Sequence, residues 1–235
     1  MLPSVWLALP ATFALALIWL RLMDFAAARG WISGPLSRKI IHIGTGPLYV
    51  LCWLLFPDQP IARYLAALVP LMITAQFFLV GAGIIKDPAA VQALSRTGDR
   101  REILRGPLIY GILFVLLTLI YWKDSPIGLI GLMVMCGGDG LADVVGRRVP
   151  SRRIPWNPSK SLAGALAMLL GGFIFSAVIL GVFSAAGVFP GSLGEALLPL
   201  AGIALAAALV ESLPIKDIDN LTTTLTAVFL GHLFF

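Results

Sequence analysis

The segment 136–164 contains the densest set of residues that could carry out chemistry. Asp139 and Asp143 are four residues apart, so on a helix both carboxylates point the same way, with Arg147 one turn further along. Two neighbouring carboxylates are typical ligands of a divalent cation, and Mg²⁺ shared with phosphate oxygens is the expected case. An acid pair that couples ion transport, or a glycine-packed helix with a capped successor, would give the same spacing.

The same segment continues into a potential phosphate site. Asn157, Lys160 and Ser161 stand just before a long apolar run, and we expect them to open its helix. A helix N-terminus flanked by a lysine and hydroxyl groups binds phosphate readily. The segment therefore predicts cation ligands followed closely by phosphate ligands.

A second polar group precedes another apolar run. Arg38, Lys39 and His42 lie within five residues of one another, with His42 about one helical turn from Arg38. Such residues commonly anchor a membrane helix by snorkelling to the interface. The functional alternative is a phosphate clamp in which His42 provides a hydrogen-bonding partner.

The last polar group lies near the C-terminus. Glu211 follows an unbroken apolar run, and Asp219 with Asn220 stands before the next one. Asp219 or Asn220 could simply cap a helix. Glu211 is harder to explain structurally, because an ionised carboxylate at membrane depth costs several kcal/mol unless it faces a polar cavity or binds a ligand.

Composition indicates which elements position these groups. Of 235 residues, 59% are hydrophobic and 12% are charged, whereas soluble domains carry about 25% charged residues. We therefore expect an all-α, polytopic integral membrane protein with a single domain, 1–235. A spanning helix needs about 20 apolar residues. The candidate spans are 3–22, 40–57, 62–85, 107–122, 126–145, 162–185, 194–212 and 221–235. The fourth and the last are short, so we predict seven or eight transmembrane helices.

The distribution of positive charge predicts the orientation. If the N-terminus lies outside and the chain crosses eight times, Arg63 and Lys123 are the only basic residues outside, as the positive-inside rule requires. Membrane insertion thus explains the net charge of +5 without a nucleic-acid partner. All the polar groups above then share one membrane face, and we expect one polar site at the cytoplasmic ends of the helices.

Several stretches resemble, in the same order, the phytol kinase and farnesol kinase group of the CTP-dependent polyprenol kinases, which include dolichol kinase. They are SRKIIHI at 37–43, DRREILRGP at 99–107, SPIGLIGLMVMCGGDGLADVVGRR at 125–148, IPWNPSKSLAG at 154–164 and ESLP at 211–214. The resemblance runs from about residue 37 to the C-terminus, and the 136–164 block is its most specific part.

The resemblance implies transfer of the γ-phosphate of CTP to the hydroxyl of a membrane isoprenoid alcohol such as phytol, geranylgeraniol or farnesol, with Mg²⁺ as cofactor. Asp139 and Asp143 would then be the catalytic residues. The implied metal ligands are Asp139, Asp143, Glu211 and Asp219, and the implied nucleotide-binding residues are Arg38, Lys39, His42, Arg147, Asn157, Lys160 and Ser161. The family usually has two acids before the final asparagine. Here Ile218 replaces the first, which favours Asp219 over Asp217 as a ligand.

Other functions share parts of this pattern. A lipid-phosphate cytidylyltransferase would also use CTP, Mg²⁺ and membrane acids, but it would attack the α-phosphate. An ion-coupled transporter would show a repeated half, and no internal repeat is visible. A lipid phosphatase would need catalytic histidines, and the chain has only His42 and His232. A bacterial inner membrane or a thylakoid membrane is the expected location. The identity of the alcohol, the choice of catalytic base and the oligomeric state stay open at this point.

Overall fold

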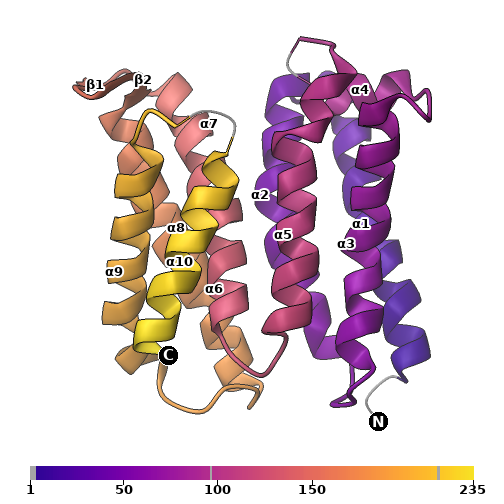
Figure 1. Ribbon diagram of the computed structural model, residues 1–235, viewed down its shortest axis with the longest axis vertical. Coiled ribbons are helices and arrows are strands. Elements are labelled where there is room, and N and C mark those ends of the chain that lie inside the picture. The colour runs from indigo at the N-terminus through magenta and orange to yellow at the C-terminus, as the bar shows by residue number, and fades with distance from the viewer. Residues whose placement is uncertain (1–3, 96, 216–217) are drawn as a thin grey trace.

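The computed structural model describes residues 4–95, 97–215 and 218–235, and within them the chain forms a bundle of long, roughly parallel and antiparallel helices (Figure 1). The long elements are α1 (Val5–Ala28), α2 (Gly34–Cys52), α3 (Ala62–Ala82), α5 (Gly106–Ile120), α6 (Ile127–Met133), α7 (Gly140–Arg148), α8 (Leu162–Ala185), α9 (Leu193–Glu211) and α10 (Asp219–Phe234). A π-helical turn, η3 (Val134–Asp139), joins α6 and α7 into one rod. The all-α membrane fold predicted from composition is confirmed.

Short elements connect these rods. They are η1 (Trp53–Leu55), α4 (Pro88–Leu94), η2 (Arg100–Leu104) and the two strands β1 (Arg153–Ile154) and β2 (Asn157–Ser161). β1 and β2 pair antiparallel as a small hairpin. The sequence predicted that Asn157, Lys160 and Ser161 would open the following helix. This is correct for Ser161, which is the N-cap of α8, but Asn157 and Lys160 lie on strand β2 instead.

Six helices among the described residues are long and apolar enough to span a membrane. They are Val5–Ala28, Ala62–Ala82, Arg100–Ile120, Ile127–Arg148, Leu162–Ala185 and Leu193–Glu211. α2 and α10 lie beside them but carry more polar residues, and α10 has only 16 residues. The predicted count of seven or eight spans is therefore approximate, and the two exceptions are helices that bring polar groups to the site.

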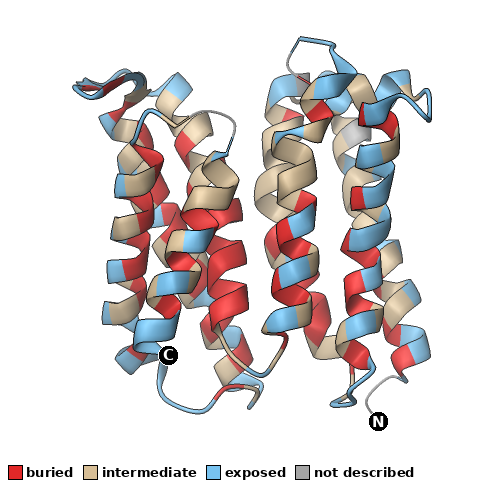
Figure 2. Ribbon diagram, viewed as in Figure 1, coloured by how far each residue is buried: buried red, intermediate tan, exposed pale blue. Residues whose placement is uncertain are grey.

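The rod α6–η3–α7 lies at the centre of the bundle. In its most apolar window 78% of the residues are buried, against 44% or less in the other five spans, and Figure 2 shows buried residues concentrated along it. Small residues allow its close contact with α8: a Cβ atom added to Gly171 would lie 2.5 Å from the carbonyl oxygen of Gly137. Because η3 contacts α2, α8, α9 and α10, its last residue, Asp139, can meet side chains from all of them.

The two ends of the bundle differ in chemistry. α4, α7 and the β1–β2 hairpin lie at one end, and the α5–α6 connection and the C-terminus lie at the other (Figure 1). The second end is closed by buried aromatic rings, among them Trp53 and Trp122 with ring centroids 5.0 Å apart. The acids and cations singled out in the sequence gather at the first end.

Candidate active site

Three carboxylates from three elements form the centre of the site. Asp139 ends η3, Glu211 is the last residue of α9, and Asp219 is the first residue of α10. One oxygen from each lies within 4.8 Å of the others. We call these three residues the acid triad. Glu211 is buried, whereas Asp139 and Asp219 are partly exposed, so the triad is open to ligands from one side.

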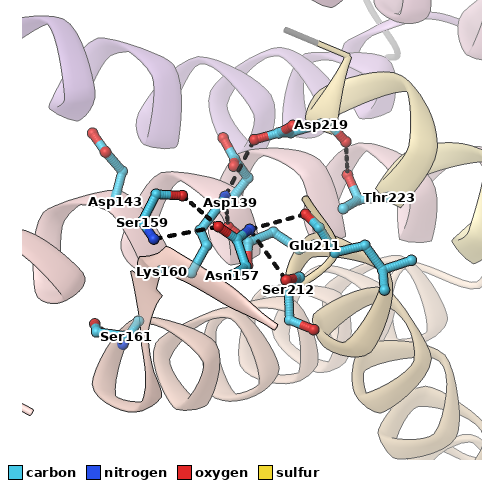
Figure 3. A network of polar contacts seen from close by, with 12 residues as sticks. Asp139, Asp143, Asn157, Ser159, Lys160, Ser161, Glu211, Ser212, Asp219 and Thr223 are labelled. Carbon is cyan, nitrogen blue, oxygen red and sulfur yellow. Dashed lines mark hydrogen bonds and ion pairs between the residues drawn. The ribbon is translucent and has the colours of Figure 1, made fainter. Parts of the chain in front are cut away.

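A lysine from the hairpin balances part of this charge. Lys160 on β2 forms an ion pair with Glu211, and its Nζ lies 3.2 Å from Asp219 Oδ2 (Figure 3). Desolvation of Lys160 opposes its positive charge, but the neighbouring carboxylates of Glu211 and Asp219 outweigh it and raise the pKa of Lys160 above its ordinary value. Lys160 is therefore a cation at neutral pH.

The hairpin is fixed to the end of α9, which places Lys160. Asn157 Nδ2 donates to the carbonyl oxygens of Ser212 (3.2 Å) and Leu213 (3.0 Å). Trp156 Nε1 donates to the Ser212 hydroxyl at 3.1 Å. Asn157, predicted to bind nucleotide, thus also has a structural role, because it joins the Lys160 hairpin to the helix that ends in Glu211.

A histidine contacts the triad from α2. His42 Nε2 lies 3.6 Å from Asp139 Oδ2 and, among the described residues, has no hydrogen-bond partner although it is buried. The Tyr110 hydroxyl donates to the backbone oxygen of His42 at 2.8 Å, and the two rings lie 4.5 Å apart. These two contacts with Tyr110 hold His42 beside Asp139.

Asp143 lies in a second group, one turn away from the triad. Its carboxylate pairs with Lys39 Nζ at 3.0 Å and with Arg147 Nε at 2.7 Å. Both Asp139 and Asp143 face α2, as their spacing predicted, because Lys39 and His42 both lie on that helix. The spacing of Asp143 and Arg147 indicated the second partner, whereas nothing in the sequence indicated Lys39. Figure 3 shows Asp143 apart from the contacts around Lys160.

The remaining predicted residues have other contacts. Arg38 Nη1 donates to the carbonyl oxygen of Ser95 at 3.0 Å, so it joins α2 to the segment after α4. Ser161 caps α8, since its hydroxyl accepts from the Gly164 amide at 3.2 Å. Asp217, which the sequence made the weaker ligand, lies outside the described residues.

The triad suits a divalent cation of the magnesium type. Mg²⁺ prefers oxygen ligands and is commonly held by one or two carboxylates together with waters and substrate phosphates. Asp139, Glu211 and Asp219 supply such oxygens within one small volume that is open on one side. The chemistry of this donor set therefore fits Mg²⁺, and Asp143 does not belong to it.

The sequence did not predict that Tyr110 and Trp156 contribute to the site. Tyr110 stands in an apolar run, where its hydroxyl requires a polar partner, but nothing in the sequence identified His42 as that partner. Trp156 is exposed and carries no charge, and its bond to Ser212 depends on how the hairpin folds back.

Comparison with known proteins identifies the group to which the chain is related. It is 40% identical over 217 residues to "Probable phytol kinase, chloroplastic" of Triticum aestivum, covering 92% of this chain and 72% of that protein. It is 41% identical to "Farnesol kinase, chloroplastic" of Arabidopsis thaliana over 209 residues, covering 88% of this chain and 68% of that protein. "Phytol kinase 1, chloroplastic" of the same plant is 38% identical, with 88% and 69% covered.

Neither a family model nor a solved structure matches the chain significantly. The matches to these kinases cover 88–92% of the chain. The chain therefore belongs to the phytol kinase and farnesol kinase group.

Proposed function

We propose that this chain is a membrane kinase that transfers the γ-phosphate of CTP to the hydroxyl of a prenyl alcohol, giving the prenyl monophosphate. The observation that carries the proposal is the acid triad, with Lys160 beside it, at one end of a membrane-spanning bundle whose relatives are named phytol and farnesol kinases. Phosphoryl transfer requires cations and correct positioning more than covalent chemistry from the protein.

The metal would be held by Asp139, Glu211 and Asp219. Bound there, Mg²⁺ would neutralise charge on the transferred phosphoryl group. This assignment narrows the ligand set expected from the sequence, because Asp143 is not one of the three carboxylates that lie within 4.8 Å of one another. It pairs with Lys39 and Arg147 instead.

The cations around the triad would bind the donor. Lys160 reaches the triad from the hairpin, and Lys39 and Arg147 lie one turn further toward the end of the bundle. Asp143 would hold Lys39 and Arg147 in place for phosphate oxygens and would thus be a positioning residue. Asp139 contacts His42 and is free of basic ion-pair partners other than that histidine among the described residues, so it is the better candidate to orient the alcohol hydroxyl.

The location of the site suits a lipid substrate. The tail of a prenyl alcohol would stay in the bilayer while its hydroxyl reaches the triad near the end of the helices. The donor would approach from the aqueous side. By the distribution of Lys and Arg, this is the cytoplasmic side of a bacterial inner membrane, or the corresponding side of a thylakoid membrane.

Labelled CTP provides the test. Membranes with the wild-type chain, and with an Asp139→Asn variant, would be incubated with phytol, geranylgeraniol or farnesol and with CTP labelled at the α- or the γ-phosphate. We expect γ-label alone to enter the lipid, and the variant to lose this transfer. Absence of transfer to any alcohol from CTP, ATP, GTP or UTP would contradict the kinase assignment. Entry of α-label into a lipid phosphate would instead identify a cytidylyltransferase.

A further inference from the structure

Lys160 contacts carboxylates that a metal ion bound at the triad would also need. Its ammonium group contacts Glu211 and lies 3.2 Å from Asp219 Oδ2, and these are two of the three carboxylates that could hold the cation. A divalent cation bound by the same oxygens would meet a positive charge at close range. The ammonium and the cation therefore compete for the same ligands.

The carboxylates also need a counter-charge when no metal is bound. Three carboxylate groups whose oxygens lie within 4.8 Å of one another repel each other strongly. Glu211 is buried, with 4% of its side chain exposed, and a buried carboxylate without a partner is costly. Lys160 supplies the missing positive charge.

The side chain of Lys160 can move while its backbone stays in place. The hairpin is held by Asn157 and Trp156, whereas the side chain of Lys160 is 25% exposed on a flexible four-carbon stem. Its ammonium can leave the carboxylates without any change in the hairpin. The exposed side of the triad is also the side from which phosphates would arrive.

Building on the proposed function, we propose that Lys160 is the resident counter-cation of the triad while no metal is bound. A divalent cation that binds the triad displaces the Lys160 ammonium group, which then pairs with the donor phosphates. The lysine keeps the triad assembled before the metal binds. It weakens binding of the metal alone, and it favours binding of metal and polyphosphate together, because the polyphosphate gives the displaced ammonium a new partner. Lys160 thereby couples the two binding events.

The test measures Mn²⁺ binding, by electron paramagnetic resonance of the free ion, to the purified full chain in nanodiscs without nucleotide. Lys160→Gln removes the competing charge and should tighten Mn²⁺ binding by at least about tenfold. The repulsion between two positive charges close together at a partly buried site exceeds the free energy that corresponds to a tenfold change in affinity. Lys160→Arg keeps the charge and should bind no more tightly than wild type. Lys86→Gln removes an exposed lysine outside the triad and should also leave the affinity unchanged.

Each outcome separates the inference from the proposed function. Equal Mn²⁺ affinity in wild type and Lys160→Gln would overturn the resident-cation role while leaving the metal site standing. Absence of Mn²⁺ binding in every form, even with CTP, would overturn the metal site and the inference together. Because the ion should replace the missing ammonium, Lys160→Gln is purified in Mg²⁺ and exchanged afterwards. A variant that stays unfolded in Mg²⁺ would contradict the inference.

Discussion

Asp139 and Asp143 lie one helical turn apart on the central rod and face the same neighbouring helix, yet their surroundings are opposite. Asp139 lies with two other acids, Glu211 and Asp219. Asp143 lies between two cations, Lys39 and Arg147. Asp139 thus belongs to three carboxylates that share the single cation Lys160 within the described part of the chain, whereas Asp143 has two cations of its own.

The difference arises from depth along the rod. Four residues advance a helix by about 6 Å, and only at the deeper level do the end of α9, the start of α10 and the hairpin lysine arrive. Nearer the loop, Asp143 pairs with Lys39 on α2 and with Arg147 on its own helix, α7. Asp139 is thus a candidate metal ligand, whereas Asp143, one turn further along the same rod, holds two cationic side chains in place.

The largest effect should follow from breaking the triad where the fold is least at risk. Asp219→Asn removes a partly exposed carboxylate. Outer partners of metal ligands contribute 10–100-fold to activity, so loss of a ligand itself should reduce kcat by at least about 100-fold. Transfer of γ-label to the alcohol measures this. Thermal unfolding without metal serves as the control and should change little. Activity within a few-fold of wild type would show that Asp219 is not a required metal ligand.

Close packing of α8 on η3 should be the next most sensitive feature. Gly171→Ala places a Cβ atom 2.5 Å from the backbone oxygen of Gly137, so the two rods must separate. We expect about 1–3 kcal/mol of destabilisation and reduced transfer, since η3 carries Asp139. Gly172→Ala is the matched control, because its nearest contact would be an ordinary 3.6 Å. Equal unfolding temperatures for the two variants would contradict this account.

A smaller effect, and one of a different kind, is expected at the second carboxylate. Asp143→Asn frees Lys39 and Arg147 from the group that holds them. The KM for the nucleotide should rise about tenfold, the lower end of what second-sphere partners contribute. Initial rates at varied CTP measure it, and Arg147→Lys tests whether a displaced charge has the same effect. A loss in kcat with unchanged KM would instead place Asp143 in the triad.

The smallest effect is expected at the opposite end of the bundle. Arg63 and Asp124 form an ion pair there whose acid is largely exposed, and exposed pairs contribute about 0–1 kcal/mol. Arg63→Gln should therefore change transfer by less than about twofold, as judged by the same assay. A large loss of activity with the fold intact would show that the chemistry is not confined to one end.

The sequence predicted the positions of the rods well because apolar length is a local property. Each of the eight candidate spans coincides with a helix or rod to within six residues at either end, although six meet the requirements for crossing a membrane. It also identified every member of the triad, since acids next to apolar runs are conspicuous.

Partner choice was not predictable in the same way. Lys160 pairs with Glu211 and Asp219 across 51 and 59 residues, and Lys39 pairs with Asp143 from another helix. These pairs depend on the relative depth of rods in the bundle. The π-helical turn that ends at Asp139 also had no sequence signal beyond two glycines.

The most direct test of the account compares the two aspartates under varied Mg²⁺. Transfer of γ-label from CTP to the alcohol would be measured across a range of Mg²⁺ concentrations for wild type, Asp139→Asn and Asp143→Asn. We predict that Asp139→Asn loses at least about 100-fold in kcat even at saturating Mg²⁺, whereas Asp143→Asn keeps the wild-type Mg²⁺ midpoint. A Mg²⁺ midpoint shifted as far in Asp143→Asn as in Asp139→Asn would contradict the division between the acid triad and the second carboxylate.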